Sequence, residues 1–340
     1  RVASMASGLR QVAGLADPVG EVLDGWVRPN GLHISRVRVP LGVVAIIYES
    51  RPNVTSDAAG LCLKSGNAAF LRGSSTAIHS NLAIASVLRE AVAKAGLPED
   101  SVIVVDDTSR EAAVEFMQQV GLIDCLIPRG GASLIASIKE HATVPFVIDG
   151  DGNCHVYVDR AADLDMAESI IVNAKTQRPS VCNAAESLVV HAKVAADLLG
   201  RLDVALADVE LVGDGRARAL VSRMGEATDE DFATEFLDLK LSVKVVDDLD
   251  AAISHVNRNS SGHSEAIVTN DVSAADRFLA EVDAAAVLLN ASTRFVDGEE
   301  FGFGAEIGIS TQKLHARGPM GLAQLTTAKY VVRGNGQTRG

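Results

Sequence analysis

Cys182 is the residue of this chain best suited to covalent chemistry. It lies in a polar run between an apolar helical pattern over 164–174 and a strand-like run over 187–191. Lys175 and Arg178 are close by in sequence, and nearby cations lower the pKa of a thiol. Cysteine taken alone is more often a small buried apolar residue. A thiolate, however, attacks carbonyl carbon well, so the setting predicts a nucleophile.

The other three cysteines carry no sign of chemistry. Cys62, Cys125 and Cys154 lie in apolar helical or strand contexts, where cysteine behaves as a structural residue. The sequence has no CxxC pair and no CxxC…H pattern, so we expect no metal site. Four cysteines in 340 residues do not make a disulfide framework, which favours a reducing, cytoplasmic location.

Composition narrows the classes of function. A net charge of −13 argues against a broad nucleic-acid-binding surface and against a surface for anionic membranes. No apolar run approaches the roughly 18–20 residues of a membrane span, and the start shows no signal sequence. The length is sufficient for two ordinary domains, each with its own core. Anionic small molecules remain possible ligands, because clustered arginines can hold them inside an acidic protein.

Strands and helices alternate along the first part of the chain, which predicts a parallel sheet with right-handed crossovers. The apolar run Val43-Val-Ala-Ile-Ile47 is typical of a strand buried on both faces. A helix is expected over 109–119, with Ser109 as its N-cap. The other elements expected here are strands over 68–72, 102–105 and 123–127 and helices over 57–64, 77–95 and 131–140.

A change of character over 145–159 indicates a domain boundary. The second series is expected to have helices over 164–174, 193–207, 249–257 and 272–282 and strands over 187–191, 209–212, 265–269 and 286–290. The expected divisions are a first domain over 1–158, a second over 159–312 that carries Cys182, and a return segment with an arm over 313–340. The tail over 326–333 is typical of an extended strand that lacks a partner. We expect it to pair with another copy in a homo-oligomer.

Three loops of the first domain combine an arginine with the start of a helix. They are 48–53 with Arg51, 72–76 with Arg72, and 128–131 with Arg129. Ligands bind at the carboxyl ends of parallel strands, and helix N-termini attract phosphate. The loops therefore predict a dinucleotide site, although neither GxGxxG nor GxxxxGK[ST] is present. Arg72 ends a strand, where a guanidinium can hold a 2′-phosphate and so favour NADPH over NADH.

A second group of donors lies in the glycine-rich stretch over 290–321. Arg294, Lys313, His315 and Arg317 offer N–H groups to a carboxylate or a phosphate. Loops of this length in a compact chain are often functional. A simple solvated connection is the alternative interpretation.

Several motifs carry a resemblance to a known family. They are Pro40-Leu-Gly-Val43, Tyr48-Glu-Ser-Arg-Pro-Asn-Val54, Cys62-Leu-Lys-Ser-Gly-Asn67, Ile127-Pro-Arg-Gly-Gly131, Val172-Asn-Ala-Lys-Thr-Gln-Arg-Pro-Ser180 with Cys182, Asn290-Ala-Ser-Thr-Arg-Phe295 and Ser310-Thr-Gln-Lys-Leu-His-Ala-Arg-Gly-Pro-Met-Gly321. Together they resemble the γ-glutamyl phosphate reductase family of the aldehyde dehydrogenase superfamily, over nearly the whole chain. The resemblance implies an α/β fold with two parallel-sheet domains, a Rossmann-like NADPH-binding domain and a catalytic domain, plus a β-strand oligomerisation arm. Family members carry a further helical segment before the point at which this sequence begins, which implies an N-terminal truncation.

The reaction that the resemblance implies is the NADPH-dependent reduction of L-glutamyl 5-phosphate to L-glutamate 5-semialdehyde. This is the second step of proline biosynthesis from glutamate. Cys182 would attack the acyl carbon and expel phosphate, leaving a thioester that hydride transfer then reduces. The resemblance also implies a functional link to glutamate 5-kinase, which makes the unstable substrate.

Residue roles carried over from the family remain partly open. The main-chain N–H of Cys182 and the side chain of Asn53 are the candidate oxyanion donors. Arg178 and Ser180 flank the nucleophile and could hold the departing phosphate. The donors for either phosphate or the α-carboxylate are Arg294, His315 and Arg317. The implied cofactor-binding residues are Arg51, Pro52, Arg72, Gly73, Ser74, Arg129, Gly130 and Gly131.

One absence favours a reductase over a hydrolytic enzyme. Hydrolytic relatives carry a Glu-Leu-Gly-Gly segment, whereas this chain has Val147-Ile-Asp-Gly-Asp-Gly152 with no glutamate. Asp149 is interpreted as a turn carboxylate and His155 as a core residue. Two alternatives stay open: an aldehyde dehydrogenase that oxidises a small aldehyde, and a non-catalytic assembly partner that kept the fold.

Overall fold

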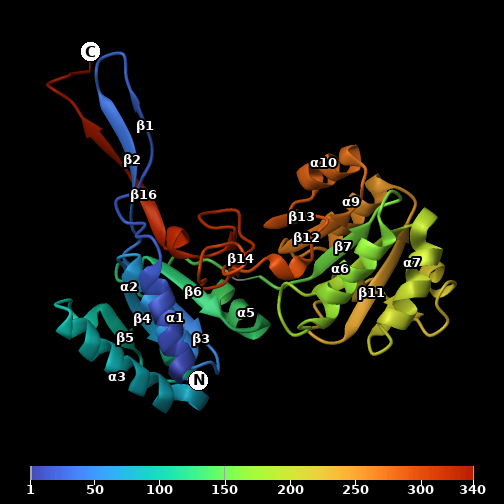
Figure 1. Ribbon diagram of the computed structural model, residues 1–340. Coiled ribbons are helices and arrows are strands. Elements are labelled where there is room, and N and C mark those ends of the chain that lie inside the picture. Colours follow the sequence, from blue (N-terminus) through green and yellow to red (C-terminus); the bar gives the residue numbers. More distant parts are fainter. Residues whose placement is uncertain (1, 149, 340) are drawn as a thin grey trace. The chain divides into compact units, whose positions relative to one another are not determined.

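The computed structural model describes residues 2–148 and 150–339, and they form two compact units. The first unit comprises 2–148, 302–308 and 314–339, and the second comprises 150–301 and 309–313. Figure 1 labels the elements and colours the chain from the N-terminus to the C-terminus.

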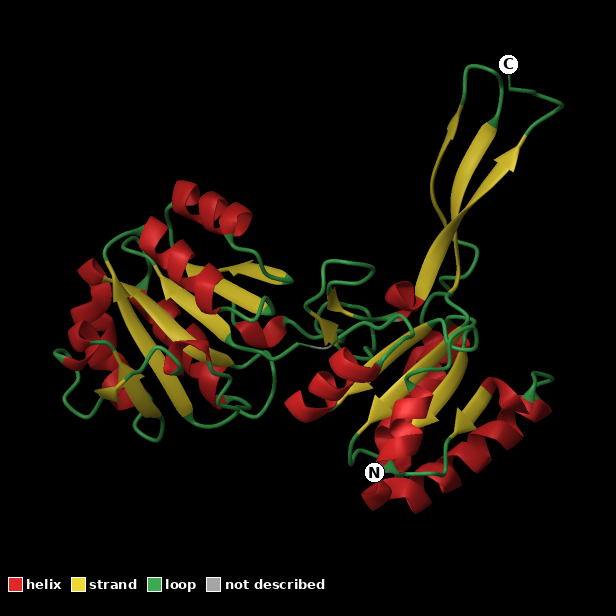
Figure 2. Cartoon of the chain, turned by 180° about the vertical axis from the view of Figure 1, so that it is seen from behind, coloured by secondary structure: helices red, strands yellow, loops and turns green. Residues whose placement is uncertain are grey.

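The first unit is built on a four-stranded parallel sheet with the order β5-β4-β3-β6. Helices cover both faces of this sheet, as Figure 2 shows. The strands are β3 (Val43–Tyr48), β4 (Ala68–Arg72), β5 (Val102–Val104) and β6 (Cys125–Arg129). One face packs against α1 (Val2–Gly14), α2 (Asn53–Lys64) and α3 (Ile78–Lys94), and the other against α4 (Arg110–Phe116) and α5 (Ala132–His141). This confirms the α/β fold class predicted from the alternating pattern.

The β3 strand shows why a continuous apolar run was needed. Val44 and Ile46 belong to the core on one face, whereas Ala45 and Ile47 belong to the core on the other face. Successive strand residues point to opposite sides, so a strand covered twice must be apolar throughout. The prediction of a strand buried on both faces is confirmed.

The predicted helix after β3 begins earlier than the sequence indicated. It starts at Asn53 rather than Asp57, directly after Pro52. The Ser56 hydroxyl donates to the Asn53 carbonyl at 2.8 Å, so a polar first turn is satisfied within the helix. Polar and β-branched residues such as Thr55 weaken the apolar periodicity on which the prediction depended.

A three-stranded antiparallel sheet forms the arm of the first unit, and we call it the arm sheet. Its strands are β1 (Val22–Val27), β2 (His33–Pro40) and β16 (Thr326–Arg333), in the order β1-β2-β16. β16 pairs with β2 from Thr326 opposite Pro40 to Arg333 opposite His33. Figure 1 shows the red β16 beside the blue β2. The predicted bounds of β16 are confirmed. The inference that β16 lacks a partner in its own chain is wrong, because it pairs with β2, a strand that was not predicted.

The second unit contains a seven-stranded parallel sheet with the order β10-β9-β11-β8-β7-β12-β13. All seven residues of β8 are buried, because it lies at the centre of the sheet. The strands are β7 (Cys154–Val158), β8 (Ala185–His191), β9 (Glu210–Gly213), β10 (Gly225–Glu226), β11 (Lys240–Val246), β12 (Ser264–Val268) and β13 (Ala286–Leu289). Of these, β11 and the short β10 were not predicted.

Four capped helices cover the seven-stranded sheet. One core contains α6 (Leu164–Thr176) and α7 (Ala192–Ala205), and the other contains α9 (Leu249–Asn259) and α10 (Val272–Glu281). Each helix has a side chain that accepts a hydrogen bond from a first-turn N–H, which satisfies a donor that the helix itself cannot. These N-caps are Asp163, His191, Asp248 and Asp271.

The remaining elements are short. In the first unit they are η1 (Ser75–Ala77), η2 (Glu99–Ser101), β15 (Gly318–Pro319) and η5 (Leu322–Leu325). In the second unit they are α8 (Gly215–Arg218), η3 (Asp231–Ala233), η4 (Thr293–Phe295) and β14 (Ile309–Ser310). Ser109 caps α4 as predicted, accepting from the Ala112 N–H at 3.2 Å. Among the described residues, no helix combines the length and apolar character that a membrane crossing requires.

Candidate active site

Cys182 lies on the turn between α6 and β8, at the amino ends of the strands of the second unit. Its side chain is partly buried. Cys154, the first residue of β7, donates its Sγ hydrogen to the Cys182 carbonyl at 3.1 Å. His263, just before β12, has its Nδ1 3.8 Å from the Cys154 sulfur. Three neighbouring strands therefore begin around Cys182.

Cys154 was predicted to be a structural cysteine, and its burial agrees with that role. Cys62, Cys125 and Cys154 are all buried, whereas Cys182 is the accessible thiol among the four. Desolvation raises the pKa of Cys154 well above the ordinary thiol value. It raises those of Cys62 and Cys125 to about 12. Only the thiolate is a nucleophile, so these three cysteines are inert at neutral pH.

Gly152 packs its main chain directly against Cys182. A Cβ built on Gly152 would come 1.7 Å from the Cys182 carbonyl oxygen and 2.5 Å from its Cα. The Gly152 N–H donates to the Glu235 carboxylate at 2.8 Å. The sequence prediction did not identify Gly152, although two glycines in Val147-Ile-Asp-Gly-Asp-Gly152 were a signal of close backbone approach.

Lys175, whose position in the sequence suggested a cation near the thiol, is instead paired with a buried carboxylate. Its Nζ donates to Glu186 Oε2 at 2.6 Å, and both side chains are fully buried. Burial lowers the pKa of Lys175 and raises that of Glu186 to about 7, against the opposing effect of their mutual attraction. Glu186 was missed by the sequence prediction, although a lone acid in an apolar strand run was its signal.

Two arginines gather near the nucleophile. Burial lowers the pKa of Arg294, the neighbouring charge of Arg178 lowers it further, and Asp297 and Cys182 oppose both effects. Arg294 Nε also donates to Gln177 Oε1 at 2.9 Å. A pair of guanidinium groups beside a thiol can hold an anionic leaving group. The structure thus brings Cys182, Arg178 and Arg294 together, and Ser180 lies on the same turn.

Hydrogen bonds tie the turn of Cys182 to the turn of Arg294. The Asn183 side-chain amide donates to the Val296 carbonyl at 2.9 Å. The Thr293 hydroxyl donates to the Asn183 carbonyl at 2.7 Å. These two contacts join segments that are far apart in sequence, so the turns that carry Cys182 and Arg294 are bonded to each other.

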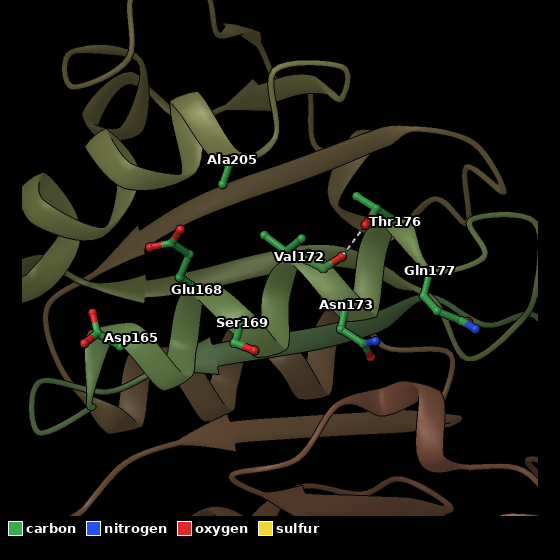
Figure 3. A pocket seen from close by; sticks show the side chains of 8 residues that line it. All are labelled: Asp165, Glu168, Ser169, Val172, Asn173, Thr176, Gln177 and Ala205. Atoms are coloured by element: carbon green, nitrogen blue, oxygen red, sulfur yellow. Dashed lines mark hydrogen bonds between the residues drawn. The ribbon is translucent and has the colours of Figure 1, made fainter.

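A hollow of 650 Å³ lies along α6, with Ala205 of α7 also lining it. Figure 3 shows the carboxylates of Asp165 and Glu168 near one end of the helix and Gln177 at the other. Gln177 is also the residue that accepts from Arg294. The hollow therefore provides room for a small polar molecule next to the contact between Gln177 and Arg294.

The predicted cofactor residues lie together at the carboxyl edge of the first unit's sheet. Arg51 and Pro52 follow β3, Arg72 ends β4, and Arg129 ends β6. Arg72 is largely buried, and its Nη2 donates to the Ser109 carbonyl at 2.6 Å. Burial lowers the pKa of Arg72, and Asp107 opposes that effect. Two glycines predicted for this site, Gly130 and Gly131, precede α5.

The sequence prediction named the Ser74 hydroxyl at this edge but missed those of Ser50 and Thr76. Ser50 Oγ lies 2.9 Å from Thr76 Oγ1, and Ser74 Oγ lies 2.8 Å from the same atom. Gly73 has no room for a side chain, because a Cβ would come 2.0 Å from Asn81 Nδ2. Arginines, hydroxyls and tight glycine turns at strand ends form a donor set that fits the anionic part of a dinucleotide.

The other predicted residues lie in different places. Asn53 is the first residue of α2 in the first unit, and its side-chain amide donates to Asp57 Oδ2 at 3.1 Å. His315 and Arg317 also belong to the first unit. His315 Nε2 donates to the Gln324 carbonyl at 2.7 Å, and its φ of 66° lies in the left-handed region.

Three further predictions concern the surroundings of the site. His155 is fully buried, with Nδ1 3.0 Å from Glu265 Oε2, so its interpretation as a core residue is confirmed. Asp149 lies outside the described residues. Over 2–148 and 150–339, the structure contains no group of three or more His, Cys, Asp or Glu side chains arranged to hold a metal ion.

Comparisons with known proteins agree with this geometry. The sequence profile of the aldehyde dehydrogenase family matches residues 1–237 and 241–331. The chain is 60% identical to a γ-glutamyl phosphate reductase from Heliobacterium modesticaldum, over 100% of this chain and 82% of that protein. The crystal structure of γ-glutamyl phosphate reductase from Thermotoga maritima matches with a TM-score of 0.98 and 50% identity, over 100% of this chain and 83% of the other. An acetylating aldehyde dehydrogenase from Geobacillus thermoglucosidasius shares the fold, with a TM-score of 0.72 and 16% identity over 99% of this chain and 89% of the other.

Proposed function

Because the chain belongs to the γ-glutamyl phosphate reductases of the aldehyde dehydrogenase family, we propose that it reduces L-glutamyl 5-phosphate to L-glutamate 5-semialdehyde through Cys182. This reaction is the second step of proline biosynthesis from glutamate. The observation that carries the assignment to residues is the meeting of one accessible thiol with two arginines in the second unit. An acyl phosphate requires that combination, because a nucleophile must form a bond while an anion leaves.

In the first half of the reaction, the acyl carbon exchanges its bond to the phosphate oxygen for a bond to sulfur. The Cys182 thiolate attacks the acyl carbon, the carbon–oxygen bond to phosphate breaks, and a thioester remains. Arg178 and Arg294 neutralise the departing phosphate, with Ser180 as a further donor on the same turn. The main-chain N–H of Cys182 and the Asn53 amide are the proposed donors to the oxyanion. His315 and Arg317 are proposed to bind the substrate's phosphate or α-carboxylate.

The second half reduces the thioester. When bound, a nicotinamide cofactor would supply the hydride for this half, and NADPH is the form that we propose. Arg51, Pro52, Arg72, Gly73, Ser74, Arg129, Gly130 and Gly131 are the proposed cofactor residues. The carbon–sulfur bond then breaks, which releases the aldehyde and returns Cys182 as thiolate. The inert state of the neighbouring Cys154 leaves Cys182 as the thiol that carries the acyl group.

The reverse reaction tests this function, because glutamyl phosphate is too labile to supply. We would follow NADP⁺ reduction by glutamate semialdehyde, with and without inorganic phosphate. Wild type would be compared with Cys182→Ala and with Cys125→Ala as the control, which removes a buried thiol of the other unit. We expect phosphate-dependent reduction in wild type and in the control, and none in Cys182→Ala.

Other outcomes would assign the chain differently. Reduction that proceeds without phosphate would indicate an aldehyde dehydrogenase that hydrolyses the thioester. No reduction by a folded wild-type protein would indicate a non-catalytic assembly partner. Reduction retained in Cys182→Ala would overturn the assignment of the nucleophile.

We also propose that the chain forms a homo-oligomer through the arm sheet. β16 is an edge strand of that sheet, and much of its surface is exposed. Large apolar side chains that are exposed on the arm include Val22, Trp26, Val27, Tyr330 and Val332. An exposed apolar sheet with an open edge favours pairing with another copy. Because the substrate is unstable, a functional link to glutamate 5-kinase is part of the same proposal.

A further inference from the structure

The turn that carries Cys182 is closed at its base by a buried ion pair. Lys175 lies in the last turn of α6 and Glu186 lies near the start of β8, on either side of the turn. Their side chains meet at 2.6 Å and are both fully buried. Removing one partner would leave an uncompensated buried charge, so the pair fixes how the helix and the strand meet.

The second oxygen of Glu186 holds a strained backbone. Its Oε1 accepts from the Leu237 N–H at 3.2 Å, and Leu237 has a φ of 55°. The Leu237 side chain is 45% exposed, so packing of that side chain does not impose the conformation. A branched residue adopts the left-handed region only where its surroundings determine it. The surrounding structure therefore holds the Leu237 main chain so that its N–H points at Glu186.

The chain segment that precedes Leu237 also reaches Gly152. Glu235, two residues before Leu237, accepts from the Gly152 N–H at 2.8 Å. Gly152 in turn packs against the main chain of Cys182. The contacts therefore run from the ion pair through the 235–237 segment to Gly152 and back to Cys182. We call this set the support circuit: Lys175, Glu186, Leu237, Glu235 and Gly152.

We propose that Glu235 and the Lys175–Glu186 pair are positioning residues for Cys182, acting through Gly152 and through the two ends of its turn. The proposal rests on the proposed role of Cys182 as the nucleophile. None of these side chains needs to touch the substrate. Their effect is on the direction in which the thiol is presented, to which covalent catalysis is sensitive because a misplacement of about 1 Å can lower a rate about 100-fold.

Glu235 gives the sharpest test, because its side chain is only partly buried and its carboxylate accepts directly from the Gly152 N–H. The variants are Glu235→Ala, Glu235→Gln and the control Glu230→Ala, at an exposed acid of the same segment. Two readouts are needed: kcat and KM in the reverse reaction, and the pH profile of iodoacetamide alkylation at Cys182 by mass spectrometry. The other three cysteines are buried, so alkylation of the native protein reports on Cys182.

For Glu235→Ala we expect kcat to fall about 10- to 100-fold while the KM values for NADP⁺ and the semialdehyde stay within about twofold. The alkylation profile should change as well. Glu235→Gln keeps an acceptor oxygen for Gly152 and should remain within about threefold of wild type, as should Glu230→Ala. A Glu235→Ala variant with wild-type kcat and alkylation would overturn the proposal.

The ion pair is tested by an apolar replacement of both partners. Buried pairs can be replaced by apolar residues of similar size with little loss of stability. We expect Lys175→Met/Glu186→Leu to keep the unfolding midpoint and to lose kcat, since Leu237 N–H loses its acceptor. A folded double variant with wild-type kcat would show that the Lys175–Glu186 pair does not position Cys182. The Glu235 variants test the positioning role of Glu235 separately. If wild type reduces no NADP⁺, the proposed function fails, whereas alkylation still tests the support circuit.

Discussion

A Cβ on Gly152 would lie 1.7 Å from the main-chain oxygen of Cys182, a separation that real Cβ contacts do not show. The partner atoms are backbone, so no side-chain rotation can relieve the clash. This close packing makes Gly152 a determinant of where the main chain of Cys182 lies. It also connects the start of β7 to the turn before β8, the two segments on which the site is built.

Replacing Gly152 should therefore remove activity. We expect Gly152→Ala to lower kcat by about 100-fold or more, because the turn of Cys182 must move on the order of 1 Å to accept the methyl group. The matched control is Gly200→Ala, on α7, where a Cβ meets nothing within 4 Å. Steady-state kinetics and thermal melts of both variants check this. A Gly152→Ala enzyme with normal kcat would contradict the role of the close packing.

Arg294 should act mainly on phosphate. We expect Arg294→Gln to raise the KM for phosphate in the reverse reaction about 10- to 100-fold, because a charge-assisted hydrogen bond contributes roughly 1.5–3 kcal/mol. The kcat at saturating phosphate should change much less. Arg258→Gln, at an exposed arginine of α9, is the control. An unchanged KM for phosphate would move the anion site away from Arg294.

Arg72 should set the choice of cofactor. If its guanidinium holds the 2′-phosphate, Arg72→Leu should lower kcat/KM for NADPH about 10- to 100-fold and leave NADH nearly unaffected. NADH serves as the internal control, because it lacks that phosphate while it shares every other contact. Equal losses with both cofactors would show instead that Arg72 supports the fold through its bond to the Ser109 carbonyl.

Acid should destabilise the second unit through His263. Burial lowers the pKa of His263 to about 4, whereas the unfolded chain has the ordinary value of about 6.5. The unfolded state therefore binds more protons between these values, and stability present above pH 6.5 is lost as pH falls towards 4. The loss should reach about 2 kcal/mol by pH 5.

Chemical denaturation at pH 7.5 and pH 5 checks that prediction. His263→Gln should show a smaller difference between the two pH values than wild type does. The control is His79→Gln, at an exposed position of α3, which should keep the wild-type difference. Equal pH dependence in all three proteins would show that His263 titrates normally in the folded state.

The arm sheet should control assembly. We expect Val332→Asp to reduce the solution mass of the wild-type oligomer, because a charge would enter an apolar contact between copies. Val204→Asp, on α7, places the same charge at a valine that is 79% exposed and should leave the mass unchanged. Light scattering after size-exclusion chromatography measures both. A monomeric wild-type protein would contradict the proposed oligomer.

The sequence by itself determined the α/β class and most element positions, and it singled out Cys182, which the structure shows as the accessible thiol among the four cysteines. Those conclusions depend on local patterns: apolar runs such as 43–47, N-caps such as Ser109, and the polar connection around Cys182. Predictions from local patterns are correct here because the buried strands are apolar throughout and the helices show a helical apolar period with N-cap residues at their starts. The bounds of β16 were predicted for the same reason, whereas its partner β2 was not.

Only the tertiary structure decided how the site is held together. Lys175 looked like a cation for the thiol, but the fold buries it against Glu186, so its charge is already paired. Gly152 and Glu235 lie in segments remote from Cys182, and the parallel sheet brings their strand ends to one edge. Arg294 follows the carboxyl end of β13, and hydrogen bonds between Asn183 and the 293–296 segment hold it beside the turn of Cys182. Such contacts depend on which strands become neighbours, and a sequence pattern that repeats every two or four residues carries no information about that order.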